Sequence, residues 1–304
     1  MVSTLLVFAV MFVSATIASP TAAAKPEIVW DGRIPKTFDV KSFDDPALSP
    51  FNVDWNHGKN QTWSEIIKFP RVPQALIRRL TPALQLDRKS AKPWAVILTD
   101  SSIFIPGDES TRQGGFRRSE VMPSINNGSD ATVQGTTTLH FSVMKDASRP
   151  LNGTHMYHVT FLETADYASH IWTLNTGTAY GTDAAGRDAK ALRLESGTTG
   201  GVPAQLLFQT EFRAGVWHNF AVQVDFEENA LAAWYSAGNN PLKQVVKRRE
   251  NDATGKGQYH IGLIKHPTGD TSNVVKQGYQ PSGINEGIIF GGVFMEGGNK
   301  VTTK

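Results

Sequence analysis

Two carboxylates in strand-like segments are the groups of this chain best suited to chemistry. Glu120 ends the segment Gly114-Gly115-Phe116-Arg117-Arg118-Ser119-Glu120, and Glu163 lies within Phe161-Leu162-Glu163-Thr164-Ala165-Asp166-Tyr167. Cleavage of a glycosidic bond needs two such acids, because one protonates the leaving oxygen while the other activates water or attacks the sugar. The two segments therefore indicate chemistry on a glycan.

Alternation along a strand defines the neighbours of each acid. Arg118 and Glu120 are two residues apart and share a face, where Arg118 can hold Glu120 ionised or donate to a sugar hydroxyl. A structural ion pair is the alternative. Glu163 shares its face with Tyr157, Val159 and Phe161. Partial burial there would raise the pKa of its carboxyl group, which suits a general acid, whereas solvation at a strand end is the alternative.

Histidines beside such acids can orient a carboxylate or contact a sugar. His140 falls on the polar face of its segment, and His260 shares a face with Gln258 and Gly262. His218 falls on the apolar face of its strand, where a hydrogen-bonded core histidine is the more usual outcome. Aromatic rings can stack on sugars, with core packing as the alternative for each. The candidates are Trp172, Tyr180, Trp234 and Tyr279.

Strand patterns dominate the chain that has to position these residues. Runs of strand-forming residues separated by Gly, Asn, Asp and Pro predict ten strands. They cover 94–99, 116–122, 136–143, 156–163, 170–175, 205–209, 217–226, 231–236, 259–264 and 287–295. Residues 62–67 and 73–80 predict short helices. We therefore expect an all-β fold over 25–304, a single antiparallel jelly roll or two-sheet concanavalin-like sandwich.

The first 24 residues have the pattern of a secretory signal peptide. They carry no charged side chain, include an apolar run from Leu5 to Val13, and allow cleavage after Ala18 or Ala24. The run is shorter than the about 20 residues that a bilayer span needs. Three sequons agree with secretion and predict glycosylation at Asn60, Asn127 and Asn152. We expect a secreted, extracellular glycoprotein.

Composition narrows the function classes further. The 304 residues carry a formal net charge of +2 without a block of like charge, which disfavours nucleic acid or a membrane surface as partner. The lack of cysteine excludes a disulfide scaffold, a thiol nucleophile and a Cys-ligated metal. No phosphate-binding loop, nucleophile-elbow serine or His-x-x-x-His pair occurs, so we expect neither cofactor nor metal. Sandwiches of this kind can hold a structural calcium, but no ligand cluster points to one. We expect a monomer.

Several blocks, in this order, resemble glycoside hydrolase family 131, a group of secreted fungal β-glucanases with a β-jelly-roll fold. They are Ile28–Arg33, Gly115–Glu120, Leu139–Ser142, Asp146–Asn152, Phe161–Tyr167, Trp217–Ala221, Gly257–Leu263 and Ser282–Gly287. The resemblance runs from about residue 28 to about residue 296, which is nearly all of the expected mature chain.

The resemblance implies hydrolysis of β-1,3-, β-1,6- or β-1,4-linked cell-wall glucans in a groove across a concave sheet. It implies that Glu120 and Glu163 are the catalytic acids and that a histidine assists, for which His260 is our first choice. We favour inversion, in which the carboxyl groups lie roughly 6.5–9.5 Å apart. The residues expected to contact substrate are Arg118, His140, Lys265, His218 and Trp172. We expect the chain to lack the cysteine-rich cellulose-binding module of some relatives, since it has no cysteine.

Two other functions fit parts of the pattern. A polysaccharide lyase abstracts a proton from a uronic acid and needs cations beside the carboxylate, which Arg117, Arg118 and Lys265 could supply. A glycan-binding sandwich without catalysis would use the same face without turnover. An unsaturated product would identify the first, and binding that survives loss of either glutamate would identify the second.

Overall fold

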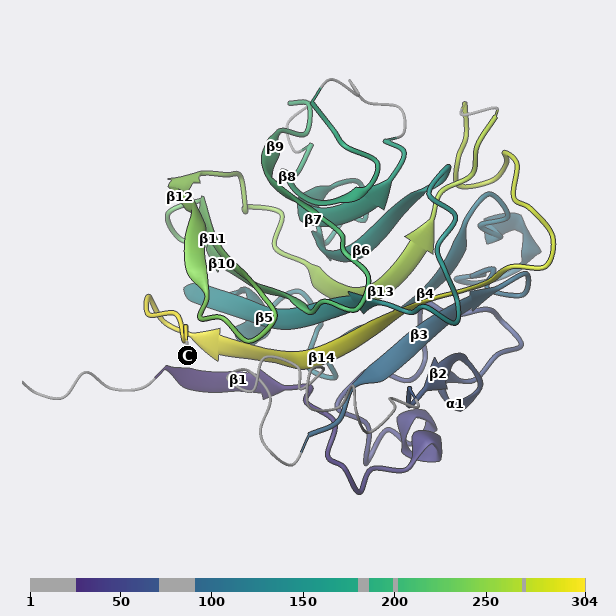
Figure 1. The fold of residues 1–304 in the computed structure, drawn as a ribbon, viewed down its shortest axis with the longest axis horizontal. Coiled ribbons are helices and arrows are strands. Elements are labelled where there is room, and N and C mark those ends of the chain that lie inside the picture. Colours follow the sequence, from purple (N-terminus) through teal and green to yellow (C-terminus); the bar gives the residue numbers. More distant parts are fainter. Residues whose placement is uncertain (1–25, 71–90, 180–185, 199–201, 270–271, 304) are drawn as a thin grey trace, which may run out of the picture.

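The chain folds into two antiparallel β-sheets packed face to face, which confirms the expected all-β sandwich (Figure 1). The structure is a computed structural model that describes residues 26–70, 91–179, 186–198, 202–269 and 272–303. The expected signal peptide and the helix expected over 73–80 lie outside these ranges. No helix among the described residues is long and apolar enough to cross a membrane.

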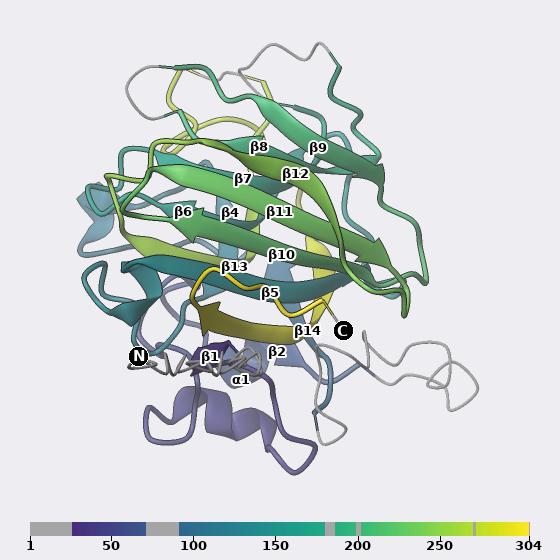
Figure 2. The same ribbon diagram turned by 90° about the vertical axis from the view of Figure 1, so that its left-hand side faces the viewer.

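The larger sheet runs in the order β12-β11-β10-β5-β14-β3-β2, with β1 paired to β14. Its strands are β1 (Glu27–Asp31), β2 (Ile67–Lys68), β3 (Trp94–Thr99), β5 (Thr136–Lys145), β10 (His218–Asp225), β11 (Ala230–Ala237), β12 (Lys243–Glu250) and β14 (Asn285–Gly297). Figure 2 looks onto the strands from β12 to β14, which lie side by side. The 13-residue β14 pairs with β1, β3 and β5 and so joins the early and middle parts of the chain.

The smaller sheet runs in the order β4-β13-β6-β7-β8-β9. Its strands are β4 (Arg117–Val121), β6 (Met156–Glu163), β7 (His170–Gly177), β8 (Ala191–Ser196), β9 (Leu206–Glu211) and β13 (Gln258–Lys265). The described helices are α1 (Trp63–Ile66) and three 3-10 turns, η1 (Val40–Asp44), η2 (Glu109–Thr111) and η3 (Ala131–Val133).

Alternation sends one face of each strand into the core between the sheets. Val121 of β4, Ile261 of β13 and Leu162 of β6 are buried there. Successive side chains of a strand point to opposite faces, so Glu120, His260 and Glu163 project away from the core. The smaller sheet thus carries the expected catalytic residues on its outer face.

The ten strands expected from the sequence are confirmed, with ends that shift by at most two residues, and α1 confirms the helical turn expected near 62–67. The strands β1, β2, β8 and β12 were not expected. β12 is mostly exposed and rich in charge, because it forms the free edge of the larger sheet. Charged edge strands resist pairing with other chains, and the same charge removes the apolar alternation by which strands are recognised.

The prediction of which residues share a face with Glu163 is wrong in part. Phe161 shares that face, but Tyr157 and Val159 lie in the core. The pairing of β6 with β7 shifts register between His158 and Thr160, which marks a bulge. An extra residue in a strand reverses the alternation beyond it, so His158 comes to the side of Glu163.

A loop covers the free edge of β4. The backbone N–H of Glu120 donates to the carbonyl oxygen of Asn56 at 3.1 Å, and that of Arg118 donates to Ser102 at 2.7 Å. An edge strand with its donors satisfied offers no template for another chain. The same bonds fix the loop around Asn56 beside the acidic face of β4.

Candidate active site

Arg118 holds Glu120 on the outer face of β4. Its Nε donates to Oε1 of Glu120 at 2.7 Å, and its Nη2 contacts the same oxygen. Its Nη1 donates to Oε1 of Gln113 at 2.8 Å. The guanidinium also lies 5.3 Å from the ring centre of Phe104. Protein groups therefore occupy each nitrogen of Arg118, and the structure makes it the partner of Glu120 rather than a free donor to sugar.

The imidazole of His260 lies between the two glutamates. Nδ1 is 3.6 Å from Oε1 of Glu120, and Nε2 is 3.3 Å from Oε2 of Glu163. The ring stacks on Phe161, with 4.5 Å between the ring centres and nearly parallel planes. Strands β4, β13 and β6 are neighbours in the sheet, which is why residues 140 positions apart meet. The three residues that the sequence marked for catalysis are thus brought together.

The members of this chain of contacts differ in exposure. The side chain of Glu163 is 18% exposed, against 2% for His260 and 0% for Glu120. Oε2 of Glu120 is buried and accepts no hydrogen bond from the described residues. Glu163 is therefore the carboxylate that solvent and substrate reach in this conformation.

Electrostatics favour charge on both partners of the His260–Glu163 contact. Burial would raise the pKa of Glu163, but the hydrogen bond and the charge of His260 outweigh burial and lower it. Burial would lower the pKa of His260, but its hydrogen bonds to Glu120 and Glu163 and their charges raise it. Each shift favours the charged form of its group, the carboxylate of Glu163 and the imidazolium of His260.

A glycine allows β4 and β13 to approach each other at Glu120. Gly262 is the residue paired with Glu120. A Cβ added at Gly262 would lie 2.4 Å from Cα and 2.7 Å from Cβ of Glu120. Such contacts are shorter than any packed side chain tolerates, so only glycine fits there.

Further histidines pack beside the pair and stay uncharged. His158 lies 4.4 Å from His266 and 5.2 Å from His170 between ring centres. Burial lowers the pKa of all three, in His170 to about 3. Neither these residues nor any other described His, Asp or Glu groups form a cluster that could hold a metal ion.

The structure places two expected substrate contacts in buried ion pairs and not on the open face of the sheet. His140 is fully buried in the larger sheet, with Nε2 2.8 Å from Oε1 of Glu296. Lys265 is fully buried, and its Nζ donates to Oε1 of Glu286 at 2.6 Å. Alternation identified the polar face of the strand that carries His140, but it did not show that other parts of the protein cover that face.

The structure places the residues of the two remaining expected contacts in the core. Trp172 is fully buried and lies in the main core cluster. His218 accepts the backbone N–H of Arg213 at Nε2, 3.2 Å away, and its Nδ1 lies 2.9 Å from the hydroxyl of Tyr235. Burial lowers the pKa of His218 to about 4. The interpretation of His218 as a hydrogen-bonded core histidine is confirmed.

Sequence reasoning missed two neighbours in the loop over β4. Asn56 places Nδ2 3.3 Å from Nδ1 of His260. Trp55 is 46% exposed and packs edge-on against Phe104, with 6.5 Å between ring centres. The other six tryptophans are less exposed. The Trp55-Asn56 pair stands in an irregular segment, where strand alternation gives no signal.

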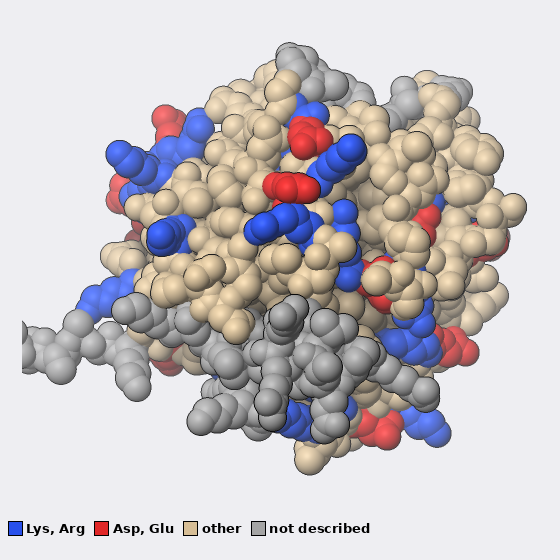
Figure 3. All heavy atoms as spheres, in the orientation of Figure 1, with Lys and Arg blue, Asp and Glu red and all other residues tan. Residues whose placement is uncertain are grey.

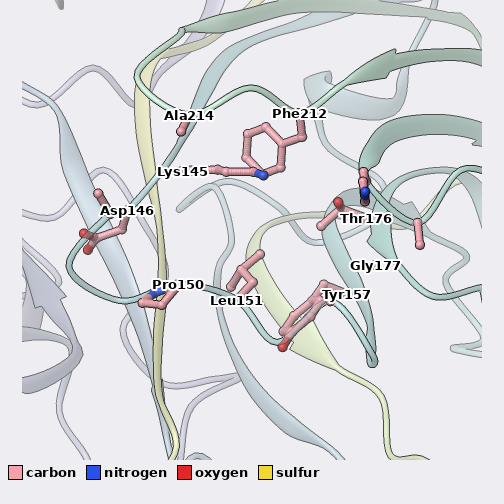
Figure 4. A pocket seen from close by; sticks show the side chains of 14 residues that line it. Lys145, Asp146, Pro150, Leu151, Tyr157, Thr176, Gly177, Phe212 and Ala214 are labelled. Atoms are coloured by element: carbon pink, nitrogen blue, oxygen red, sulfur yellow. The ribbon is translucent and has the colours of Figure 1, made fainter.

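A cavity of about 280 Å³ lies away from these residues, at the opposite end of β6. Tyr157 at the start of the strand lines it, together with Lys145, Leu151 and Phe212. Figure 4 shows Lys145 extending across the cavity toward Phe212, whose ring centre is 5.1 Å from Nζ. On the face drawn in Figure 3, Lys and Arg lie among Asp and Glu over the described residues.

Comparison with known proteins gives one family and two close folds. The sequence model described as "Glycoside hydrolase 131 catalytic N-terminal domain" matches residues 28–301. A GH131 β-glucanase catalytic domain from Podospora anserina superposes with a TM-score of 0.67 at 23% identity, over 91% of this chain and 98% of that one. The catalytic domain of a family 131 protein from Coprinopsis cinerea gives a TM-score of 0.64 at 19% identity, over 91% and 97%. A search among curated proteins gives no match.

Proposed function

The chain belongs to glycoside hydrolase family 131, and we propose that it hydrolyses β-linked glucans with Glu120 and Glu163 as its pair of acids. The β-1,3-, β-1,6- and β-1,4-linked polymers of cell walls are the proposed substrates. One observation carries the assignment of the acids: the imidazole of His260 lies between these two carboxylates, within 3.6 Å of each.

The proposed reaction breaks the bond between C1 and the glycosidic oxygen. Water adds at C1 and gives a proton to the base, while the acid gives a proton to the leaving oxygen. An imidazole ring that lies between the carboxylates favours a separation greater than the about 5–5.5 Å of retaining enzymes. This spacing supports inversion, with the water held on the face of the sugar opposite the leaving group.

Exposure and charge support a division of roles. Glu163 is the accessible carboxylate, and its lowered pKa keeps it ionised, which suits the base that activates water. We assign the acid role to Glu120. Arg118 contacts only Oε1, which leaves Oε2 to carry the proton. Because Glu120 is fully buried, this role requires the groups that cover its side chain to shift when glycan binds.

Trp55 is the tryptophan that we expect to stack on a sugar, because Trp172 is buried in the core. Its exposed ring is joined to the acids through Phe104, which lies under Arg118. An aromatic ring complements the C–H face of a glucosyl unit, so Trp55→Ala should raise KM for glucan about three- to tenfold with little change in kcat. Unchanged KM would remove Trp55 from the substrate path, and Leu48→Ala, at another exposed apolar residue, serves as control.

Two of the three cations that a uronate lyase would need are already paired with carboxylates. Lys265 is bound to Glu286, and Arg118 to Glu120. A substrate carboxylate would have to displace these partners. The contacts therefore favour a neutral glucan.

We propose that the protein is secreted as a glycosylated monomer. The acceptor residues Asn60 and Asn127 are exposed and Asn152 is half-buried, which supports glycosylation at the first two most directly. Treatment of the secreted protein with an endoglycosidase should lower its mass, and Asn→Gln variants should assign each site.

The first test is release of reducing ends from laminarin and swollen cellulose. Wild type should release them, and Glu120→Gln or Glu163→Gln should lower the rate by about 10²- to 10⁴-fold. Glu211→Gln, at an exposed carboxylate on β9, is the control and should be active. Glycan binding by an inactive wild type would favour the non-catalytic alternative.

A second test separates the roles of the glutamates. Substrates with a leaving group that needs no protonation should restore turnover to Glu120→Ala but not to Glu163→Ala. Proton NMR of the first product should show the α-anomer if the enzyme inverts. If these substrates restore turnover to Glu163→Ala and not to Glu120→Ala, then Glu163 is the acid and Glu120 is the base.

A further inference from the structure

Asn56 is a buried polar residue in an uncommon backbone conformation. Its φ of 68° lies in the left-handed region, which glycine and asparagine adopt more readily than other residues. It is 6% exposed, and its carbonyl oxygen accepts the backbone N–H of Glu120. Its amide nitrogen lies 3.3 Å from Nδ1 of His260. One loop residue thus contacts both the strand of one acid and the ring between the two.

We infer that Asn56 is a positioning residue that keeps the proton of the neutral His260 ring on Nε2, where it faces Glu163. An amide N–H only donates, so Nδ1 accepts and carries no proton in this arrangement. Nε2, which lies 3.3 Å from Oε2 of Glu163, then carries the one proton of the neutral ring. The inference rests on the proposed function, because a proton on Nε2 faces Glu163, the carboxylate that takes a proton from water.

Glu120 competes with Asn56 for the same nitrogen. Its Oε1 lies 3.6 Å from Nδ1, and its negative charge would favour a proton there. The amide of Asn56 is nearer, and Arg118 already donates to Oε1. Without the amide, the proton would move to Nδ1, and Nε2, the nitrogen that faces Glu163, would carry none.

The ring is surrounded by titratable and charged groups from three strands. Arg118 and Glu120 face it from β4, Glu163 from β6, and His170 from β7. Because the pKa of the half-buried His170 is lowered to about 3 and its ring is uncharged, the carboxylates and the guanidinium set the charge around His260. Asn56 is neutral, so its effect is on the site of the proton more than on the total charge.

Two substitutions at Asn56 separate the effect of its side-chain amide from the effect of its backbone. Asn56→Gly accepts the left-handed φ and keeps the bond to Glu120 but removes the amide. Asn56→Asp presents an acceptor to Nδ1 in place of a donor. Asn229→Gly is the matched control, because Asn229 also has a left-handed φ, of 49°, in the turn between β10 and β11.

Nitrogen-15 NMR of the histidine side chains, with His260 assigned through His260→Asn, reports the site of the proton at a pH where the ring is neutral. Wild type and Asn229→Gly should carry it on Nε2, whereas both Asn56 variants should carry it mainly on Nδ1. We expect kcat to fall about 10- to 100-fold in Asn56→Gly, as for other groups that orient a histidine, with KM within twofold.

An Nε2 proton retained in Asn56→Gly and Asn56→Asp would overturn the inference. The NMR measurement needs no substrate, so it is independent of the proposed function. A shifted proton in an enzyme without glucanase activity would overturn the function alone. An active enzyme whose proton does not move would overturn the inference alone.

Discussion

At the scale of single residues, the reactivity of Glu163 is controlled by the residue beside it. Its carboxylate reaches solvent, but the charge and the hydrogen bond of His260 set its pKa. Arg118 donates a hydrogen bond to Oε1 of Glu120 and so orients that carboxylate. Each acid therefore has one cationic partner that fixes its orientation.

The pH dependence should follow from the His260–Glu163 pair. A lowered pKa keeps Glu163 ionised below its ordinary 4.5, so the acidic limb of kcat/KM should lie below that pH. His260→Asn removes the imidazolium and leaves burial, which raises the pKa. We expect the acidic limb to move upward and kcat/KM to fall, in initial rates measured from pH 3 to 9. An acidic limb that stays in place would show that another group controls it.

The buried Lys265–Glu286 pair should affect stability and not substrate binding. Lys265→Met leaves the carboxylate of Glu286 buried without its partner, which should cost about 3–5 kcal/mol of unfolding free energy. The double variant with Glu286→Gln should recover part of the loss. Urea denaturation measures both, and KM of the folded enzyme should stay at the wild-type value. A raised KM without loss of stability would reinstate Lys265 as a substrate contact.

At the scale of the elements, alternation predicted which residues share a face but not which faces are covered. It brought Glu120, His260 and Glu163 to one side of one sheet. It also placed His140 on a polar face that is buried. Period-two patterns carry no information about loops that cover a sheet, and a bulge such as that in β6 reverses them without a sequence signal.

The close approach of β4 and β13 predicts a sensitive position. Gly262→Ala would force Glu120 away from its pairing partner, because the new Cβ would lie 2.4 Å from Cα of Glu120. We expect kcat to fall at least tenfold while the protein still folds, since a misplacement of about 1 Å can cost about 10²-fold in rate. Gly153→Ala, with open space around its Cβ, is the control. Equal activity in the two variants would contradict the role assigned to Gly262.

At the scale of the whole molecule, buried neutral histidines link the fold to pH. Burial lowers the pKa of His218 to about 4 and that of His170 to about 3. The unfolded chain takes up these protons near pH 6.5, before the folded chain does. Their contribution to stability is therefore present above pH 6.5 and is lost as the pH falls toward 4 and 3.

The urea midpoint should accordingly fall between pH 6.5 and 4. His218→Gln, which cannot titrate, should show a shallower fall than wild type although its stability at pH 7 is lower. If the urea midpoints of the two proteins fall in parallel with pH, His218 does not contribute to the pH dependence of stability. His57→Gln, at a half-buried histidine, is the control.

The pairing of β14 also sets the order in which the molecule can be assembled. A ribosome makes this strand after the other strands that the structure describes, yet β1, β3 and β5 all pair with it. Until residues 285–297 emerge, β3 and β5 expose unpaired backbone that can join strands of other nascent chains. Because pairings between distant parts of a chain form slowly, the newly made protein should depend on chaperones at the stage before its final strand is available.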